Sequence, residues 1–258
     1  MNKRGQVTSF IVLGLVLVII AFLVFYFLGD RLTKKSEEEV IFHESELEPL
    51  KNYVEECIKL HGDEGLLIVG KQGGDINPGL YTSYMFPFDT EMSRLSYLCY
   101  TENFTSCINK RPLLAKHIES ELNFFMLERL RTCIDLDQIR EEGYKIEEGD
   151  MSINTNIGER VVIINVNYPL TISKGNNVIK EERFSQTFNV PLGVLIETAN
   201  DIVDDEITLG EFFTVPYMMS KHGRIEVEKH RPGDSKVYKI KTYDSNYIFQ
   251  FAVKNYVY

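Results

Sequence analysis

The residues that could carry chemistry in this 258-residue chain do not form a catalytic pattern. The histidines lie at positions 43, 61, 117, 222 and 230, and they match neither a zinc-finger spacing nor the His-Glu-x-x-His helix. The chain also lacks the Gly-x-Ser-x-Gly turn that presents the nucleophile of an α/β-hydrolase. We therefore predict no catalytic residue, no metal site and no cofactor, and we expect that the protein is not an enzyme.

Two further stretches have the composition of ligand-binding loops but not their spacing. The run VGKQGGDINPG, residues 69–79, has neither the Gly-Lys-Ser/Thr ending of a phosphate-binding loop nor the Gly-x-Gly-x-x-Gly pattern. The run DIVDDE, residues 201–206, lacks the alternating ligands and the glycine of an EF-hand loop. We expect the first run to be a turn and the second to be the solvated end of a helix.

The four cysteines suit disulfide bonds better than a metal site, because they form no Cys-x-x-Cys pair. Three full pairings are open to them. A bridge from Cys99 to Cys107 would close the polar stretch YTENFTS, and Cys57 and Cys133 would then join two segments far apart in the sequence. Disulfides persist outside the cytosol, so this pairing predicts an extracytosolic domain. Four reduced, buried cysteines are the alternative.

The stretch between Cys99 and Cys107 also contains Asn103-Phe104-Thr105, which matches the acceptor pattern for N-glycosylation. Asn103 is therefore a candidate glycosylation site, and the pattern fits an exposed loop.

The charge balance argues against a nucleic-acid partner. The chain has 38 acidic and 28 basic residues and a net charge of −10 at pH 7. Binding to a phosphate backbone requires clustered lysine and arginine. We therefore predict no nucleic-acid binding.

The longest apolar run lies near the N terminus. Residues 7–28 contain no charged side chain. A helix of this length would measure about 33 Å, enough to cross the hydrocarbon core of a bilayer. The run ends in VFYFLGD without a small-residue cleavage site, unlike a removable secretory signal. We predict a basic cytoplasmic end at 1–6, a transmembrane helix at 7–28 and a juxtamembrane linker or stalk at 29–44.

Helical periodicity comes first after this linker. Residues 45–60 place apolar side chains at helical spacing behind Ser45, which suits a helix N-cap. Gly62 and Gly65 then end this predicted helix. Residues 112–134 repeat the pattern and begin with proline, which favours the first turn of a helix. The segment between the two helices, 78–110, is predicted to be extended and loop-rich. Its aromatic side chains are expected to pack against the helices, and an aromatic binding surface is the alternative.

After Gly143 the apolar spacing changes to the alternation that is typical of β-strands. Residues 151–173 give two alternating runs around Gly158, and residues 178–192 give a third, which predicts an antiparallel meander. A short helix is predicted at 192–203, and the last residues give two or three more strands.

The predicted fold class is α+β. It consists of an N-terminal transmembrane or stalk helix and then a disulfide-bonded ectodomain at 45–258, in which amphipathic helices are followed by an antiparallel β-sheet. Residues 45–142 form the helical and looped part, and residues 143–258 form the β-rich part.

The residues before the apolar run resemble those of a known family. KRGQ directly before an apolar helix resembles the class III signal peptides of archaeal type IV pilin-like proteins. The resemblance implies that a membrane peptidase cuts between Gly5 and Gln6 on the cytoplasmic side and leaves the apolar helix on the mature chain. Thr8 matches the third position of the family pattern after the cut. Phe10 stands where the family usually has a glutamate that supports filament assembly.

Much of the remaining chain resembles a group of uncharacterised archaeal proteins, especially from small-genome, host-dependent lineages. The segments that carry this resemblance include YVEECIKL, VNYPLTIS and YIFQFAVKNY. The resemblance implies no activity.

These features predict a structural or interaction protein at the cell surface, with its N terminus cytoplasmic and its C-terminal domain extracellular. The first hypothesis is a pilin-like subunit, processed by a signal-peptide peptidase, that assembles with itself into a filament or homo-oligomer. The alternative is an uncleaved, single-pass membrane-anchored ectodomain that contacts another cell or the envelope. An envelope enzyme is the third hypothesis. The Gly5-Gln6 pair favours the first hypothesis, and Phe10 favours the second.

Overall fold

The computed structural model describes residues 48–141, 143–175 and 177–256, which all lie in the compact unit Ser45–Tyr258. Its elements in chain order are α2 (Glu48–Lys71), β1 (Tyr81–Tyr84), β2 (Ser93–Tyr100), β3 (Ile108–Asn109), α3 (Leu114–Cys133), α4 (Asp137–Glu141), β4 (Lys145–Glu148), β5 (Ser152–Ile157), β6 (Val162–Lys174), β7 (Asn177–Phe188), α5 (Leu192–Thr208), α6 (Thr214–Ser220), β8 (Ile225–His230), β9 (Lys236–Thr242) and β10 (Ile248–Lys254).

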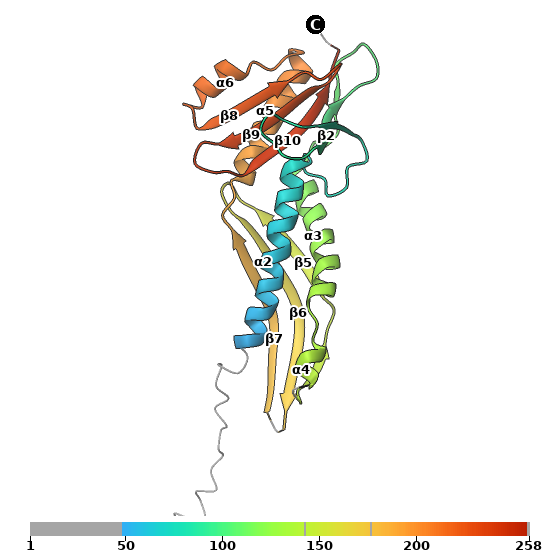
Figure 1. Ribbon diagram of the computed structural model, residues 1–258, viewed down its shortest axis with the longest axis vertical. Helices are drawn as coiled ribbons and strands as arrows, with labels where there is room; N and C mark the ends of the chain where they lie inside the picture. Colours follow the sequence, from blue (N-terminus) through green and yellow to red (C-terminus); the bar gives the residue numbers. More distant parts are fainter. Residues whose placement is uncertain (1–47, 142, 176, 257–258) are drawn as a thin grey trace, which may run out of the picture. The chain divides into compact units, whose positions relative to one another are not determined.

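One sheet joins the first strands of this unit to the last ones (Figure 1). Its order is β1–β2–β10–β9–β8, with the short β3 also paired to β2. Strands β2 and β10 run parallel, and the other neighbours run antiparallel. The five central residues of β10 are all buried, because this strand lies inside the sheet and is covered on both faces.

The second sheet is built around the long strand β6. Strand β7 pairs with one edge of β6 along nearly its whole length, from Val162 opposite Phe188 to Lys174 opposite Asn177. Strands β5 and β4 pair in succession with the other edge. Buried and more exposed side chains alternate regularly along β6, as its sequence VIINVNYPLTISK predicts.

Helices α2 and α3 lie side by side against the second sheet (Figure 1). Helix α2 continues through Gly62 and Gly65, so the prediction that these glycines end the helix is wrong. A side-chain carbon on Gly62 would lie 2.2 Å from Phe188 of β7, and one on Gly65 would lie 3.0 Å from Phe125 of α3. The two glycines therefore allow the helix to approach its neighbours closely.

Helix α5 packs against β9 and β10 and buries a carboxylate at its last turns. Glu206 is fully buried and accepts hydrogen bonds from the Tyr238 hydroxyl and from Lys236 Nζ, the latter at 2.6 Å. Lys236 Nζ also donates to the Gly210 carbonyl at 2.7 Å. The prediction that 201–206 is a solvated helix end is therefore wrong for Glu206, because its helix lies against the sheet.

The unit is α+β, disulfide-bonded and rich in antiparallel strands. The predicted architecture, in which helices are followed by one antiparallel sheet, is wrong. Strands precede α3, and two sheets replace the single sheet that was expected after the helices. The segment 78–110, expected to be extended and loop-rich, contains β2, whose buried residues include Leu95 and Leu98. This strand pairs with the last strand of the described residues, which the sequence did not indicate. No helix of the described ranges is long and apolar enough to cross a membrane. Residues 7–28 lie outside those ranges.

Candidate functional site

The two disulfide pairs expected from the sequence are the two pairs present in the structure. Cys57 of α2 is bonded to Cys133 at the end of α3, with 6.0 Å between their Cα atoms. Cys99 of β2 is bonded to Cys107, with 5.4 Å between their Cα atoms. The first bond links the two helices, and the second closes the loop that carries Asn103.

The other residues that the sequence analysis selected are not brought to a common site. Gly5, Gln6, Thr8 and Phe10 lie outside the described residues. Asn103 is exposed on its loop, where its backbone N–H donates to Thr101 Oγ1 at 3.2 Å. This exposure fits an acceptor site, while glycosylation itself stays a prediction.

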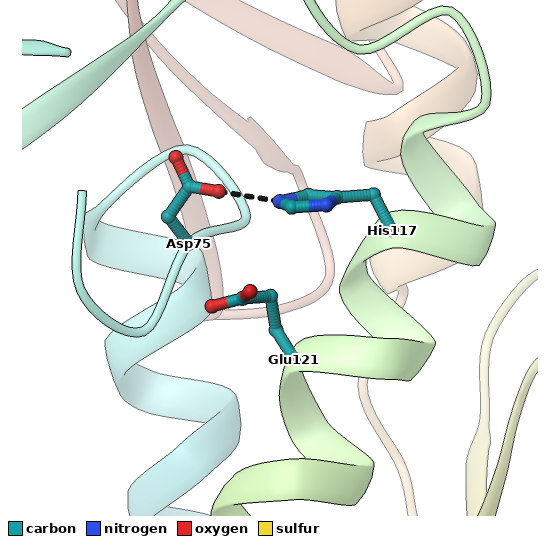
Figure 2. A group of neighbouring side chains, drawn as sticks. All are labelled: Asp75, His117 and Glu121. Carbon is teal, nitrogen blue, oxygen red and sulfur yellow. Dashed lines mark hydrogen bonds and ion pairs between the residues drawn. The ribbon is translucent and has the colours of Figure 1, made fainter. Parts of the chain in front are cut away.

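A cluster that the sequence analysis missed lies where the turn after α2 meets α3 (Figure 2). Asp75 comes from this turn, and His117 and Glu121 lie one helical turn apart on α3. Gly73 and Gly74 have φ angles of 72° and 95°, which favour glycine. A side-chain carbon on Gly74 would lie 2.8 Å from an isoleucine of α3. The glycines therefore bring Asp75 close to α3.

The Asp75 carboxylate is 4% exposed, and both of its oxygens are hydrogen-bonded. Ser96 Oγ of β2 donates to Oδ2 at 2.5 Å, and Arg111 Nη2 lies 3.2 Å from Oδ1 and 3.3 Å from Oδ2. His117 Nε2 also contacts Oδ1. Burial alone would raise the pKa of Asp75, but the hydrogen bonds from His117 and Ser96 and the charge of Arg111 hold that pKa below its usual value.

Glu121 completes the connection between the turn and the helix. Its Oε2 accepts the backbone N–H of Ile76 at 2.9 Å, so the residue after Asp75 is also bound to α3. Through these contacts the cluster joins the turn after α2, strand β2, the segment before α3 and α3 itself. Such a hydrogen-bonded polar cluster helps to specify how these four segments pack together.

Three side chains of this cluster carry atoms that could bind a cation. One ligand atom from each of Asp75, His117 and Glu121 lies within 4.8 Å of the others, and these residue types bind divalent metals. However, the Arg111 guanidinium already contacts both oxygens of Asp75 and places a positive charge at the position where a metal would bind. The residues therefore fit an ion-paired structural cluster and do not fit a metal centre.

The cluster also lacks the arrangement of a nucleophile and its base. The Ser96 hydroxyl donates to Asp75, whereas the hydrogen-bond contacts of the His117 ring are with Asp75 and Arg111. Both contacts use Nε2, which carries either a proton or a lone pair and so serves one of them at a time. Asp75 and Arg111 thus hold the imidazole in place without presenting a nucleophile to it.

The sequence did contain a signal for part of this cluster. Glu121 follows His117 by four residues within a predicted helix, which places both side chains on one face. The prediction of no metal site did not take this pair into account. Asp75 lies in the run 69–79 that was expected to be a turn; in the structure α2 continues to Lys71 before the turn begins.

A second feature is the loop between β1 and β2, residues 85–92, which we call the β1–β2 tip. Its exposed apolar side chains are Met85, Phe88 and Met92. Phe88 is fully exposed and has a φ of 70°, a left-handed backbone conformation that is rare for an aromatic residue. The aromatic residues of 78–110 were expected to pack inside, and that expectation is wrong for Phe88.

The residues on either side of Phe88 fix the β1–β2 tip to the sheet. Phe86 is 1% exposed, and the Asp89 backbone N–H donates to its carbonyl at 3.1 Å. The Asp89 carboxylate accepts hydrogen bonds from Lys239 Nζ of β9 at 2.5 Å and from Gln250 Nε2 of β10 at 3.0 Å. These anchors hold the Phe88 ring in solvent.

Comparisons with known proteins do not assign this fold or site. No protein-family model, no curated protein and no solved structure matches the chain.

Proposed function

We propose that the unit Ser45–Tyr258 is a disulfide-bonded structural or interaction domain of a cell-surface protein, and that it contacts a second copy of the chain through the β1–β2 tip. The observation that carries the proposal is the exposed, backbone-strained Phe88 between two anchored neighbours. Strained backbone conformations persist where the surrounding structure enforces them, and they concentrate at functional sites.

The chemistry of the β1–β2 tip suits a protein contact. Phenylalanine and methionine are enriched at the centres of protein interfaces, and methionine adapts its shape to a partner. Exposed aromatic anchors of this kind contribute much of the binding energy in many complexes. Since the anchors of the tip are already formed, docking would require little further ordering of the loop.

The disulfides support an extracytosolic location. Each of the four cysteines is in a bond, and disulfides are rare in proteins that remain in the reducing cytosol. The pilin-like hypothesis adds self-assembly, and it requires a mature chain that begins at Gln6. The alternative, an unprocessed surface protein that contacts another cell or the envelope, requires a chain that still begins at Met1 or Asn2.

The contact is tested with Phe88→Ser in the full-length protein, and Phe124→Ser on α3 is the matched control because that phenylalanine is also exposed. We expect the unsubstituted protein and the control to self-associate in sedimentation velocity, and we expect Phe88→Ser to remain monomeric. Self-association that survives Phe88→Ser, or its absence in the unsubstituted protein, would refute the self-contact.

The location and the processing are tested on the native protein. We expect protease shaving of intact cells to digest the unit Ser45–Tyr258, and a protected unit would exclude the surface location. N-terminal mass spectrometry then distinguishes the two hypotheses. Under the pilin-like hypothesis, Gly5→Val should block processing because a β-branched side chain would crowd the scissile bond.

A further inference from the structure

We propose that the unit binds a small zwitterion, a free α-amino acid with an apolar side chain, in a cleft at the start of α5. The cleft has a volume of about 360 Å³ and lies between the β5–β6 turn, the first turns of α5, the segment before β8 and the end of β9. This volume falls within the range of small-molecule sites. The proposal is independent of the self-contact through the β1–β2 tip.

The floor of the cleft is mainly apolar. Val194 of α5 and Ile225 of β8 line it, and Ile225 is 5% exposed. The nearby Thr198 hydroxyl is satisfied, since it donates to the Val194 carbonyl at 3.0 Å. Thr242 of β9 is also buried, and its hydroxyl helps to keep the pKa of the neighbouring Asp244 below its usual value. The floor thus offers an apolar surface whose hydroxyl groups are already engaged by the protein.

Most charges on the rim of the cleft are already paired with each other. Arg160 forms an ion pair with Asp244, and both residues line the cleft. Lys221 Nζ lies 3.5 Å from a carboxylate oxygen of Asp201 and 4.0 Å from one of Glu197. A ligand that used these cations would first have to displace a carboxylate.

Two other charged side chains that line the cleft, one of each sign, form no ion pair with the described residues. Within the described ranges, Arg224 has no carboxylate within 4.0 Å, and its Nε reaches only the Lys221 carbonyl at 3.4 Å. Glu159 likewise has no cation within that distance among the described residues, although its carbonyl accepts the Val194 N–H at 3.2 Å. The rim therefore offers one guanidinium for a carboxylate and one carboxylate for an ammonium group.

These features select the class of ligand. A guanidinium binds a carboxylate through two parallel hydrogen bonds, and an unpaired glutamate attracts an ammonium group. A multiply charged phosphate would meet the carboxylates of Glu159 and Asp244 across the same opening. A molecule with one positive charge, one negative charge and an apolar side chain matches both the rim and the floor.

The experiment titrates the full-length protein with L-leucine and with two analogues, using isothermal calorimetry. L-Leucinamide lacks the carboxylate, and 4-methylpentanoate lacks the ammonium group. We expect L-leucine to bind and each analogue to bind at least tenfold more weakly, because each loses a charged hydrogen bond. Concentrations up to about 10 mM would reveal even a millimolar Kd.

Variants assign the two ends of the ligand. Arg224→Gln should weaken L-leucine at least tenfold and leave L-leucinamide unchanged, while Glu159→Gln should leave 4-methylpentanoate unchanged. Arg183→Gln on β7, an exposed arginine outside the cleft, is the matched control and should change nothing. The proposal is wrong if L-leucine does not bind, if L-leucinamide binds equally well, or if Arg224→Gln has no effect in a protein with unchanged circular dichroism.

Discussion

Replacing Phe88 with glycine is expected to stabilise the folded unit, although it removes a large apolar side chain. The ring is fully exposed, so its loss removes little packing. The φ of 70° places the residue in the left-handed region, which costs a residue other than glycine about 1–2 kcal/mol. Glycine avoids that cost. However, its greater conformational freedom in the unfolded chain lowers the stability of the folded unit by about 0.5–1 kcal/mol. The mid-points of these two ranges differ by about 0.75 kcal/mol, and the predicted gain lies between about 0 and 1.5 kcal/mol.

Thermal unfolding with the disulfides intact measures this gain. For a unit of this size, 1 kcal/mol corresponds to a change in Tm of about 2–4 °C. Phe88→Ala is the matched control, since it removes the same ring but keeps a side chain at the left-handed position. We expect the alanine variant to unfold close to the unsubstituted protein and below the glycine variant.

A Phe88→Gly variant that is no more stable than Phe88→Ala would show that position 88 carries no backbone strain. A large loss of stability in both variants would show that the ring packs against the domain. A stabilised Phe88→Gly variant that no longer self-associates would link the strain to the proposed contact.

Three further predictions concern the interior and the charges of the unit. Lys236→Met should lower the free energy of unfolding by about 3–5 kcal/mol, because Glu206 would remain buried without its cation. Urea denaturation measures this loss, and a change below about 1 kcal/mol would contradict the prediction. Removing the Cys57–Cys133 bond with two alanines should cost about 2–4 kcal/mol in the same assay, and an unchanged unfolding midpoint would argue against a stabilising bond. Burial raises the pKa of Glu211, but three neighbouring cations lower it to about 2. This residue therefore contributes stability above its ordinary pKa of 4.5 that is lost as the pH falls toward 2. Glu211→Gln should flatten that acid limb, and an unaltered pH profile would exclude the contribution.

Local patterns in the sequence predicted several elements well. Strand β6 alternates over its whole length, and the helix expected at 112–134 is α3, Leu114–Cys133. Both patterns depend on periods of two or 3.6 residues, which are visible in any short window. The disulfide pairs were also expected, because a bridge from Cys99 to Cys107 closes a short polar stretch and leaves Cys57 and Cys133 to pair.

Contacts between distant segments were not visible in that way. The parallel pair β2–β10 joins residues near position 97 to residues near position 252, and no local pattern encodes such a partner. Gly62 was predicted to end a helix. In the structure it leaves space for the Phe188 ring against the helix, and that contact depends on a residue far away in the sequence. The hydrogen bonds of Asp75 come from β2, from the segment before α3 and from α3. These partners lie 21 to 42 residues away in the sequence, so no local pattern around Asp75 indicated them.

Residue types and their short-range spacing predicted the α+β composition of the unit and most of its helices and strands. The pair Cys57–Cys133, whose members lie 76 residues apart, belonged to one of three full pairings that the sequence left open, and the fold selected it. The tertiary structure decided which polar residues meet, which aromatic ring remains in solvent and which charges at the α5 cleft lack a partner. Those properties depend on where the chain returns to itself, and a charge or an apolar ring acquires its role from the neighbours it finds there.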